Sequence, residues 1–254
     1  MALSLEEYEA YQPLTRVDCE GRPLVFCTPN RMTAWRAQSL FEKEPATVQW
    51  ILGFAAGVRL LDVGANVGVY TILAAVMRQA RVVAFEPESQ NYALLNRNIH
   101  ANGVAASVVA YCGALSDQTG ASALHLSQFE AGVSCHSLGA EVGFDLAPRR
   151  SAFVQGIFGY RLDDLIASGA IPVPQHIKID VDGFEHKVVA GARATLARVE
   201  VRSVLVEINH NLEEHLDLVD ELTGLGYRHD PEQVARAERK AGTFKGVAEY
   251  VFER

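Results

Sequence analysis

The chain has 254 residues, with 23 Lys and Arg against 31 Asp and Glu, so its formal net charge is −8. Hydrophobic residues make up 49% and charged residues 21%, which is ordinary globular usage and excludes a disordered or collagen-like chain. The acidic balance argues against a nucleic-acid backbone or an anionic membrane surface as the main partner, and no apolar run approaches the ~18 residues of a membrane span. The four cysteines lack zinc spacing and the N-terminus lacks a signal peptide, so we expect a cytoplasmic protein without a metal cluster.

The first 57 residues have a mixed pattern that predicts helices over 31–41 and 45–56. Pro45 suits the first turn of the second helix, where its missing N–H costs nothing. We therefore expect a small helical or lid segment over 1–57, followed by one domain over 58–254.

From residue 59 short apolar runs alternate with segments of helical periodicity. The predicted core strands are Arg59–Val63, Arg81–Phe85, Ser107–Tyr111, His176–Asp180 and Ser203–Ile208. The predicted helices are Tyr70–Met77, Ser89–Ala101, Phe184–Val199 and Asn211–Leu225. Apolar strands separated by amphipathic helices indicate an α/β, Rossmann-like parallel sheet with helices on both faces. The tail can add two strands, Tyr227–His229 and Ala248–Phe252, one of them antiparallel.

Residues 117–160 interrupt this alternation. They are rich in glycine and carry short alternating pieces such as the run from Ala123 to Leu126. We expect an insertion of hairpins or loops before the fourth core strand, on the substrate side of the domain.

A glycine-rich turn gives the clearest chemical signal. Gly64 and Gly68 follow an apolar strand and precede a helix, which allows a tight turn and brings backbone N–H groups close to a ligand. Glu86 ends the next strand, where an acidic side chain accepts hydrogen bonds from ribose hydroxyls. This pair of features predicts a cofactor that contains a nucleoside.

The turn differs from a dinucleotide fingerprint. Asn66 occupies the position of the middle glycine that admits a pyrophosphate, and Asp62 begins the turn. A carboxylate repels a phosphate but attracts a cationic amino group. Asp62 therefore points to the ammonium of a methionine moiety, and the predicted ligand is S-adenosylmethionine.

Several motifs together resemble the FkbM-like family of class I S-adenosylmethionine-dependent methyltransferases. They are LLDVGANVGVYT (60–71), VVAFEPESQNYALLNRN (82–98), GALSDQTG (113–120), YRLDDL (160–165), IKIDVDGFEHKVVAGA (177–192) and LVEIN (205–209). The resemblance covers about residues 40–210 and implies the seven-stranded methyltransferase fold with S-adenosylmethionine as donor. It also implies O-methylation of a hydroxyl on a sugar, glycolipid or polyketide-type molecule.

The expected cofactor residues lie at the ends of the first three core strands. They are Asp62, Gly64, Ala65, Asn66, Gly68, Glu86, Pro87, Ala114, Leu115 and Asp117. The backbone around Leu115 would flank the adenine. Asp117 either reaches the adenine amino group or serves as a turn residue before Thr119 and Gly120.

The acceptor side is expected at the ends of the fourth and fifth strands. Asp180 would orient the donor or the acceptor hydroxyl, with Asp182 and Glu185 close by, although Glu185 also suits a helix N-terminus. Glu207 lies in an apolar strand, where an ionised group must be paired or used. His210 follows that strand and could remove the hydroxyl proton near neutral pH.

Some alternatives remain open. Asp180 and Glu207 could hold magnesium, but three oxygen ligands at fixed spacing are not evident, so we predict no metal. His125 and His136 could reach over the pocket from the insertion. Lys178 is expected to place its charge at the sheet edge. A nicotinamide-dependent oxidoreductase and a non-catalytic cofactor-binding domain are the alternative functions.

Overall fold

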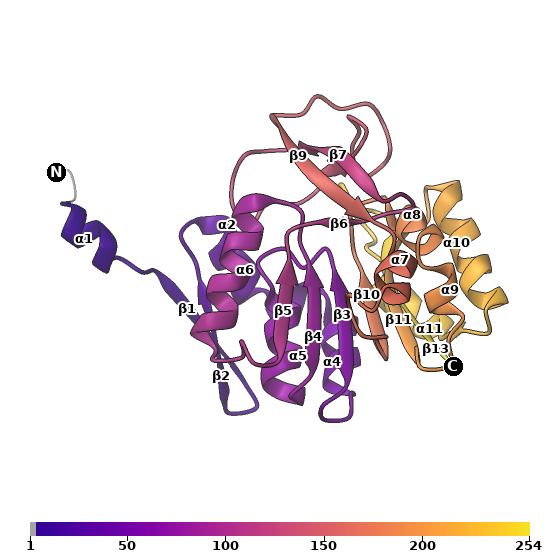
Figure 1. The fold of residues 1–254 in the computed structure, drawn as a ribbon, viewed down its shortest axis with the longest axis horizontal. Coiled ribbons are helices and arrows are strands. Elements are labelled where there is room, and N and C mark those ends of the chain that lie inside the picture. The colour runs from indigo at the N-terminus through magenta and orange to yellow at the C-terminus, as the bar shows by residue number, and fades with distance from the viewer. Residues whose placement is uncertain (1–3) are drawn as a thin grey trace.

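The computed structural model describes residues 4–254 and contains a seven-stranded sheet at the centre of the molecule (Figure 1). The strand order is β12-β13-β11-β10-β3-β4-β5, and β13 runs antiparallel to both of its neighbours while the other pairs are parallel. The strands are β3 (Arg59–Val63), β4 (Arg81–Phe85), β5 (Val108–Tyr111), β10 (His176–Ile179), β11 (Ser203–Asn209), β12 (Arg228–His229) and β13 (Val247–Glu253). The predicted α/β sheet is confirmed, including its antiparallel strand near the end of the chain.

Alternate side chains of the strands enter two hydrophobic cores, one on each face of the sheet. In β3, Leu60 joins a core with Leu73 and Leu95, whereas Leu61 joins the core that contains Val188. The helices of the first core are α4 (Pro45–Leu52), α5 (Val69–Arg78) and α6 (Ser89–Ala101). The helices of the second are α7 (Leu162–Ala167), α8 (Glu185–Ala190), α9 (Arg193–Leu196), α10 (Glu213–Gly224) and α11 (Pro231–Ala237). Burial of each large apolar side chain contributes about 1.5–3 kcal/mol, so these two cores hold the sheet in place.

The predicted helix over 184–199 is wrong in one respect, because the structure divides it into α8 and α9. Gly191 ends α8 where the backbone of Ser116 passes very close, and a Cβ at this glycine would lie 2.0 Å from the Ser116 carbonyl oxygen. The side chain of Asp163 then accepts hydrogen bonds from the backbone N–H groups of Ala194 and Thr195 in the first turn of α9. A tertiary contact therefore interrupts a segment whose apolar periodicity is continuous.

The N-terminal segment also differs from the predicted helical arrangement. Besides α1 (Leu5–Ala10), α2 (Arg31–Gln38) and α3 (Leu40–Lys43), it contains a hairpin of β1 (Leu14–Cys19) and β2 (Arg22–Cys27). Glu20 and Gly21 form its turn with positive φ values of 51° and 79°, as a tight hairpin requires. The hairpin packs into the first core together with α4, and the domain boundary after residue 57 stays a prediction.

The insertion forms a small sheet of its own, as the sequence predicts. Its strand order is β6-β9-β7-β8. The strands are β6 (Ala114–Leu115), β7 (Gly120–Leu126), β8 (Ser137–Leu138) and β9 (Phe153–Tyr160). Figure 1 shows β7 and β9 above the carboxyl ends of the central strands, so the insertion covers the edge where α/β sheets bind their ligands.

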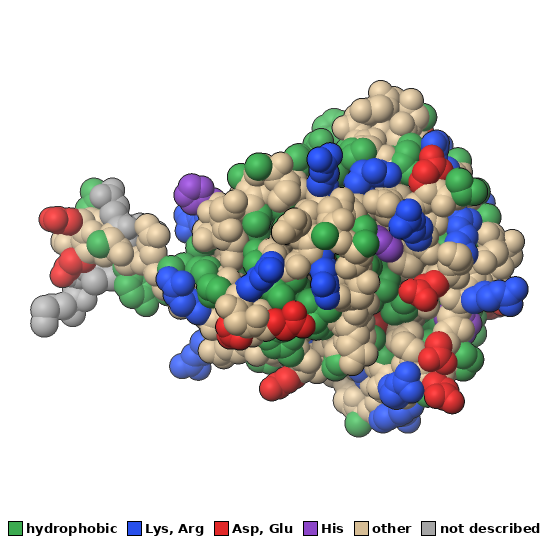
Figure 2. All heavy atoms as spheres, turned by 90° about the horizontal axis from the view of Figure 1, so that it is seen from below, with side chains coloured by type: hydrophobic (Ala, Val, Ile, Leu, Met, Phe, Trp, Pro, Cys, Tyr) green, Lys and Arg blue, Asp and Glu red, His purple; other side chains and the backbone are tan. Residues whose placement is uncertain are grey.

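Figure 2 shows the molecule from below, which is the side away from the insertion. On that face basic and acidic side chains are interspersed among hydrophobic and other residues. Within the described range 4–254, no helix has the length and apolar character needed to cross a membrane.

Candidate functional site

A cavity of about 630 Å³ lies between the carboxyl ends of the central strands and the insertion. Its size is in the usual range for small-molecule sites. Its wall is built by α2 and Lys43, the ends of the central strands and the residues that follow them, several parts of the insertion including the loop at 133–136, and the segment after α11. Parts of the chain that are distant in sequence therefore meet at this one edge.

The predicted glycine turn forms part of the wall. Gly64 has a φ of +79°, and a Cβ there would lie 1.8 Å from the carbonyl oxygen of Asp180. Its N–H and that of Ala65 both donate to the Phe85 carbonyl at 3.0 Å. Gly64 and Asn66 line the cavity, whereas Ala65 and Gly68 lie behind them and shape the turn. Only glycine fits at position 64, because a side chain would collide with β10.

Glu86 reaches the cavity wall at the end of β4, beside Pro87. Its Oε2 accepts a hydrogen bond from the Asn66 N–H at 2.7 Å, and its Oε1 accepts one from the Glu88 N–H at 2.9 Å. Burial raises the pKa of Glu86 to about 7, although these two N–H groups oppose the change. The carboxylate is fixed in position and keeps lone pairs for a ligand.

The expected adenine side is only partly as predicted. Ala114 and Leu115 line the cavity, and so does the neighbouring Ser116. Asp117 is exposed and lies outside the wall, where it accepts a hydrogen bond from the Ser116 hydroxyl at 3.1 Å. This position fits the alternative turn role of Asp117 better than a contact with the adenine.

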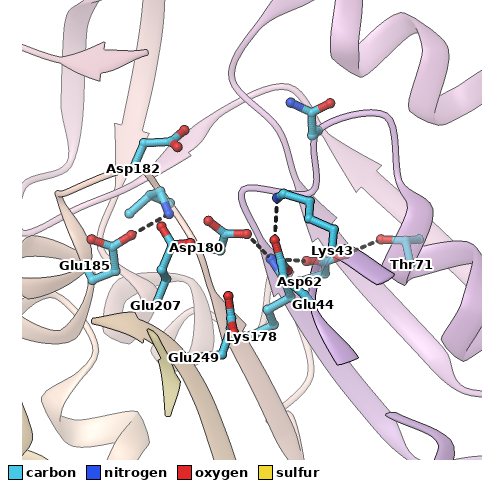
Figure 3. A network of polar contacts seen from close by, with 12 residues as sticks. Lys43, Glu44, Asp62, Thr71, Lys178, Asp180, Asp182, Glu185, Glu207 and Glu249 are labelled. Atoms are coloured by element: carbon cyan, nitrogen blue, oxygen red, sulfur yellow. Dashed lines mark hydrogen bonds and ion pairs between the residues drawn. The ribbon is translucent and has the colours of Figure 1, made fainter. Parts of the chain in front are cut away.

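Asp62 does not line the cavity, and Figure 3 shows it among the neighbouring polar side chains Lys178 and Thr71. The residue is 1% exposed. Its Oδ2 accepts a hydrogen bond from the Thr71 hydroxyl at 2.5 Å, while its Oδ1 has no hydrogen-bond partner within the described part of the chain and lies 3.9 Å from Lys178 Nζ. The ammonium group beside Asp62 in the structure is therefore that of Lys178. The expected contact of Asp62 with a ligand ammonium stays a prediction.

Lys178 corrects a second prediction. Its charge was expected at a sheet edge. However, β10 lies between β3 and β11 in the centre of the sheet, so Lys178 is not on an edge strand. The buried Nζ lies 2.8 Å from Asp180 Oδ2. Burial alone would lower the pKa of Lys178, but Asp180 and Asp62 outweigh burial and raise it. Lys178 therefore stays charged beneath the cavity and orients Asp180.

Asp180 and Glu207 both line the cavity at the ends of neighbouring strands. Burial opposes the charge of Asp180, but Lys178 and Lys43 outweigh it and hold the pKa of Asp180 at about 2. Burial raises the pKa of Glu207 to about 7, with Asp180 adding to the rise and Arg239 opposing it. The site therefore combines a fixed anion with a carboxyl group that titrates near neutrality.

Sequence reasoning did not find the partners of Glu207. Arg239 places Nη1 2.8 Å from Glu207 Oε1 and Nη2 2.8 Å from Glu249 Oε1, and Glu44 lies 3.7 Å away. Lys43 pairs with Glu44 from the N-terminal side. One signal was available, because β13 carries Glu249 among apolar residues just as β11 carries Glu207. Two like charges directly opposite in an antiparallel pair require a cation between them.

The expected general base is not at the cavity. His210 Nε2 lies 2.9 Å from the Tyr250 hydroxyl and its Nδ1 lies 3.9 Å from Glu238, both on the β13 side. His210 does not line the cavity, so the structure gives no support to the expectation that it faces the acceptor beside Asp180. The chain turns away after β11, because the His210 N–H bonds the carbonyl of Gly246.

Two histidines were expected to reach over the pocket from the insertion, and only one does. His125 lies outside the wall, 3.5 Å from the Ser151 hydroxyl, whereas His136 lines the cavity. Burial lowers the pKa of His136 to about 4. Its imidazole is therefore neutral at pH 7.

The other two acids of the fourth strand end have different positions. Asp182 lines the cavity and accepts a hydrogen bond from the Cys135 N–H at 2.7 Å. Glu185 is fully buried and accepts hydrogen bonds from the N–H groups of Val181 and Gly183. Its carboxylate comes within 4.8 Å of Asp180 and Glu207, so the structure groups three carboxylates at this point. Each of the three has protein partners, as described above.

Comparison with known proteins identifies the type of domain. The model of the methyltransferase FkbM domain matches residues 62–229. A hexuronic acid methyltransferase, AglP from Haloferax volcanii, is 30% identical over 150 residues, which are 59% of this chain and 55% of the relative. The matched part thus spans about half the length of that curated relative.

Solved structures of low sequence identity also align with this chain. Precorrin-6y C5,15-methyltransferase from Geobacter metallireducens aligns with a TM-score of 0.47 and 13% identity, over 83% of this chain and 86% of that one. TYW2 from P. horikoshii in complex with MeSAdo aligns with a TM-score of 0.45 and 11% identity, over 96% of this chain and 71% of that one.

Proposed function

This chain belongs to the FkbM family of S-adenosylmethionine-dependent methyltransferases, and we propose that it methylates a hydroxyl oxygen of a sugar-type small molecule. The observation that carries the proposal is the convergence of the glycine turn, Glu86, Asp180 and Glu207 on one cavity. The similarity to a hexuronic acid methyltransferase supports a sugar acceptor. Hydroxyl groups of glycolipids and polyketides are included among the acceptors to be tested.

The cavity fits S-adenosylmethionine in its chemistry. Glu86 offers carboxylate lone pairs to the ribose hydroxyls, and Pro87, Ala114 and Leu115 offer an apolar wall to the adenine. Glycine at position 64 lets the turn pack directly against the Asp180 carbonyl, and the Gly64 backbone forms part of the cavity wall. When bound, S-adenosylmethionine supplies an electrophilic methyl group on a sulfonium sulfur.

The residues at the ends of β10 and β11 would act on the acceptor. Arg239 occupies Oε1 of Glu207, and Oε2 has no hydrogen-bond partner among residues 4–254. A carboxylate with a pKa of about 7 suits proton removal near neutral pH. Glu207 Oε2 would accept the proton of the acceptor hydroxyl, whose oxygen would take up the methyl group that the donor supplies.

Asp180 has a different role, because Lys178 keeps it anionic. Its carboxylate accepts a hydrogen bond from the acceptor and fixes the oxygen in line with the breaking bond. Alignment of this kind is the main contribution that a protein can make to methyl transfer, because the donor is already activated. Lys178 acts through Asp180 and is a positioning residue.

The test has two parts, beginning with binding. Thermal shift with S-adenosylmethionine, S-adenosylhomocysteine and NAD should raise the melting temperature for the first two only, since a ligand stabilises the native state that binds it. Stabilisation by NAD alone would favour the oxidoreductase alternative.

The second part measures chemistry. Isotope-labelled methyl groups should pass to sugar hydroxyls in a panel of sugars, glycolipids and polyketides, giving an alkali-stable ether detected by mass. An alkali-labile methyl ester would contradict a hydroxyl acceptor. Donor binding without transfer to any member of the panel would favour a non-catalytic cofactor-binding domain.

A further inference from the structure

Two guanidinium groups at the cavity wall have no carboxylate partner within 4.0 Å among the described residues. They belong to Arg36 in α2 and to Arg149 in the insertion, before β9. The other buried cations of the site are paired, Lys178 with Asp180 and Arg239 with Glu207. Arg36 and Arg149 are only half-buried, yet both line the cavity.

Both side chains are anchored on one short loop, which orients them toward the same region. Arg36 Nε donates to the carbonyl of Gly132, and Arg149 Nη2 donates to the carbonyl of Cys135. Those two residues are three positions apart, so they can be separated by at most about 11 Å even if the loop is fully extended. Each guanidinium uses one of its five N–H groups in this way and keeps the others for a ligand.

Among the described residues, the acids of the cavity have other partners and form no direct ion pair with these two arginines. Asp180 is engaged by Lys178 and Glu207 by Arg239. Asp182 accepts from a backbone N–H of the insertion, and Glu86 accepts from two backbone N–H groups near the glycine turn. The positive charge of the two arginines is therefore uncompensated by a direct contact with the protein.

His136 lies on the same loop, within the electrostatic field of the two arginines. Burial is the main cause of its low pKa of about 4, and Arg149 and Arg36 both lower it further against the opposing influence of Glu88. The loop thus presents two permanent cations and a neutral imidazole to the cavity. Paired guanidinium groups bind carboxylates and phosphates through charge-assisted, often bidentate hydrogen bonds.

We propose that the methyl acceptor is an anionic molecule, whose carboxylate or phosphate is bound by Arg36 and Arg149 while its hydroxyl faces Glu207. This inference rests on the proposed function and specifies its substrate class. The alternative occupant of the two arginines is the carboxylate of the donor itself, and the experiment below separates the two.

The protein is loaded with S-adenosylhomocysteine and titrated calorimetrically with three matched sugars. They are methyl glucoside, which is neutral, methyl glucuronide, which adds a carboxylate, and glucose 6-phosphate, which adds a phosphate. We expect at least one of the two anionic sugars to bind tenfold or more tightly than the neutral one, and the arm that does so identifies the anion. Equal affinity for all three, or no binding of either anionic sugar, would overturn the proposal.

Variants identify the residues. Arg36→Gln and Arg149→Gln should each reduce binding of the preferred anionic sugar about tenfold and leave the affinity for S-adenosylhomocysteine within about twofold. Arg150→Gln is the matched control, because Arg150 is exposed and does not line the cavity. A large loss of S-adenosylhomocysteine affinity in both cavity variants would assign the arginines to the donor and overturn the proposal.

Failure of the proposed function gives a different result. A wild-type protein that binds neither S-adenosylmethionine nor S-adenosylhomocysteine would contradict the methyltransferase assignment. The same sugars titrated into the unloaded protein would then still decide whether the two arginines form an anion site.

Discussion

Asp180 and Glu207 end neighbouring strands and face one cavity, yet their surroundings separate their pKa values. Lys178 lies 2.8 Å from Asp180 on the buried side and favours its charged form. Glu207 is paired with Arg239, but burial and the charge of Asp180 together raise its pKa to about 7. The two carboxylic acids thereby suit the two roles in the proposed hydroxyl methylation, a permanent anion and a proton acceptor.

A first prediction concerns Glu207. Glu207→Gln keeps the shape of the side chain but cannot accept a proton, so turnover should fall about a hundredfold or more with little change in donor affinity. In the wild-type enzyme kcat/KM should rise with pH through about 7, as Glu207 loses its proton, and the variant should lack this rise. The measurement is kcat/KM against pH for both proteins.

The matched control for this experiment is His210→Ala. His210 contacts Tyr250 outside the cavity, so this variant should keep the wild-type pH profile and nearly normal turnover. If His210→Ala lost the rise of kcat/KM with pH while Glu207→Gln retained it, His210 and not Glu207 would be the proton acceptor.

A second prediction concerns donor binding. Glu86→Ala removes the carboxylate at the end of β4 and should weaken S-adenosylmethionine binding by about 1.5–3 kcal/mol, the usual value of hydrogen bonds to a charged group. Asp117→Ala should bind the donor normally, because Asp117 lies outside the wall. Calorimetric titration of both variants checks this, and equal affinities would show that Glu86 does not contact the donor.

At the scale of elements, Asn98 of α6 and Asn102 at its C-terminal end form hydrogen bonds with the free edge of the N-terminal hairpin. Asn98 Oδ1 accepts from the Cys27 N–H at 2.7 Å, and its Nδ2 donates to the Val67 carbonyl at 2.7 Å. Asn102 bonds both the N–H and the carbonyl of Val25. The edge of β2 is thereby satisfied by side chains, which also tie the hairpin to the glycine turn.

This arrangement gives a third prediction. Asn98→Ala leaves two buried backbone groups without partners, so the free energy of unfolding should fall by about 2–4 kcal/mol. Asn96→Ala serves as control, since exposed Asn96 bonds only within its own helix and should change stability by less than about 0.5 kcal/mol. Urea unfolding of the two variants is the measurement. A drop of similar size in both would mean that the loss does not come from the support of the hairpin.

At the scale of the whole molecule, the buried charges connect stability to pH. Burial raises the pKa of Glu86 and Glu207 to about 7 and that of Glu249 to about 8, whereas unfolded carboxyl groups titrate near 4. Between pH 6.5 and 8.5 the folded protein therefore binds more protons than the unfolded chain, and the free energy of unfolding falls as pH rises. Burial also lowers the pKa of three histidines to about 4, and at these groups the unfolded chain binds more protons below pH 6.5, which offsets the carboxyl groups there: His136, His176 and His215.

The fourth prediction follows from this balance. The ligand-free protein should lose on the order of 2–3 kcal/mol of stability between pH 6.5 and pH 8.5, which corresponds to several degrees in Tm. Glu249→Gln removes the group with the highest of these three pKa values and should remove about half of that loss. Thermal unfolding at the two pH values tests this, and a wild-type Tm that rises toward pH 8.5 would contradict the assignment of raised pKa values.

The sequence alone determined the sheet, the glycine turn, Glu86 and the position of the insertion, because these depend on local periodicity and short spacings. The central strands lie close to their predicted bounds, and Gly64, Glu86, Asp180 and Glu207 all reach the cavity. A strand end, once placed in a parallel sheet, carries its next residues to the ligand edge.

Only the tertiary structure decided which charged side chains face the cavity. Asp62 and Lys178 point beneath it because they meet each other inside the sheet, and His210 follows the backbone toward Tyr250. Arg239 enters from a segment more than thirty residues after Glu207, at a register that only the pairing of β11 with β13 fixes. The physical reason is that burial of a charge depends on a partner from elsewhere in the chain, and local patterns do not specify that partner.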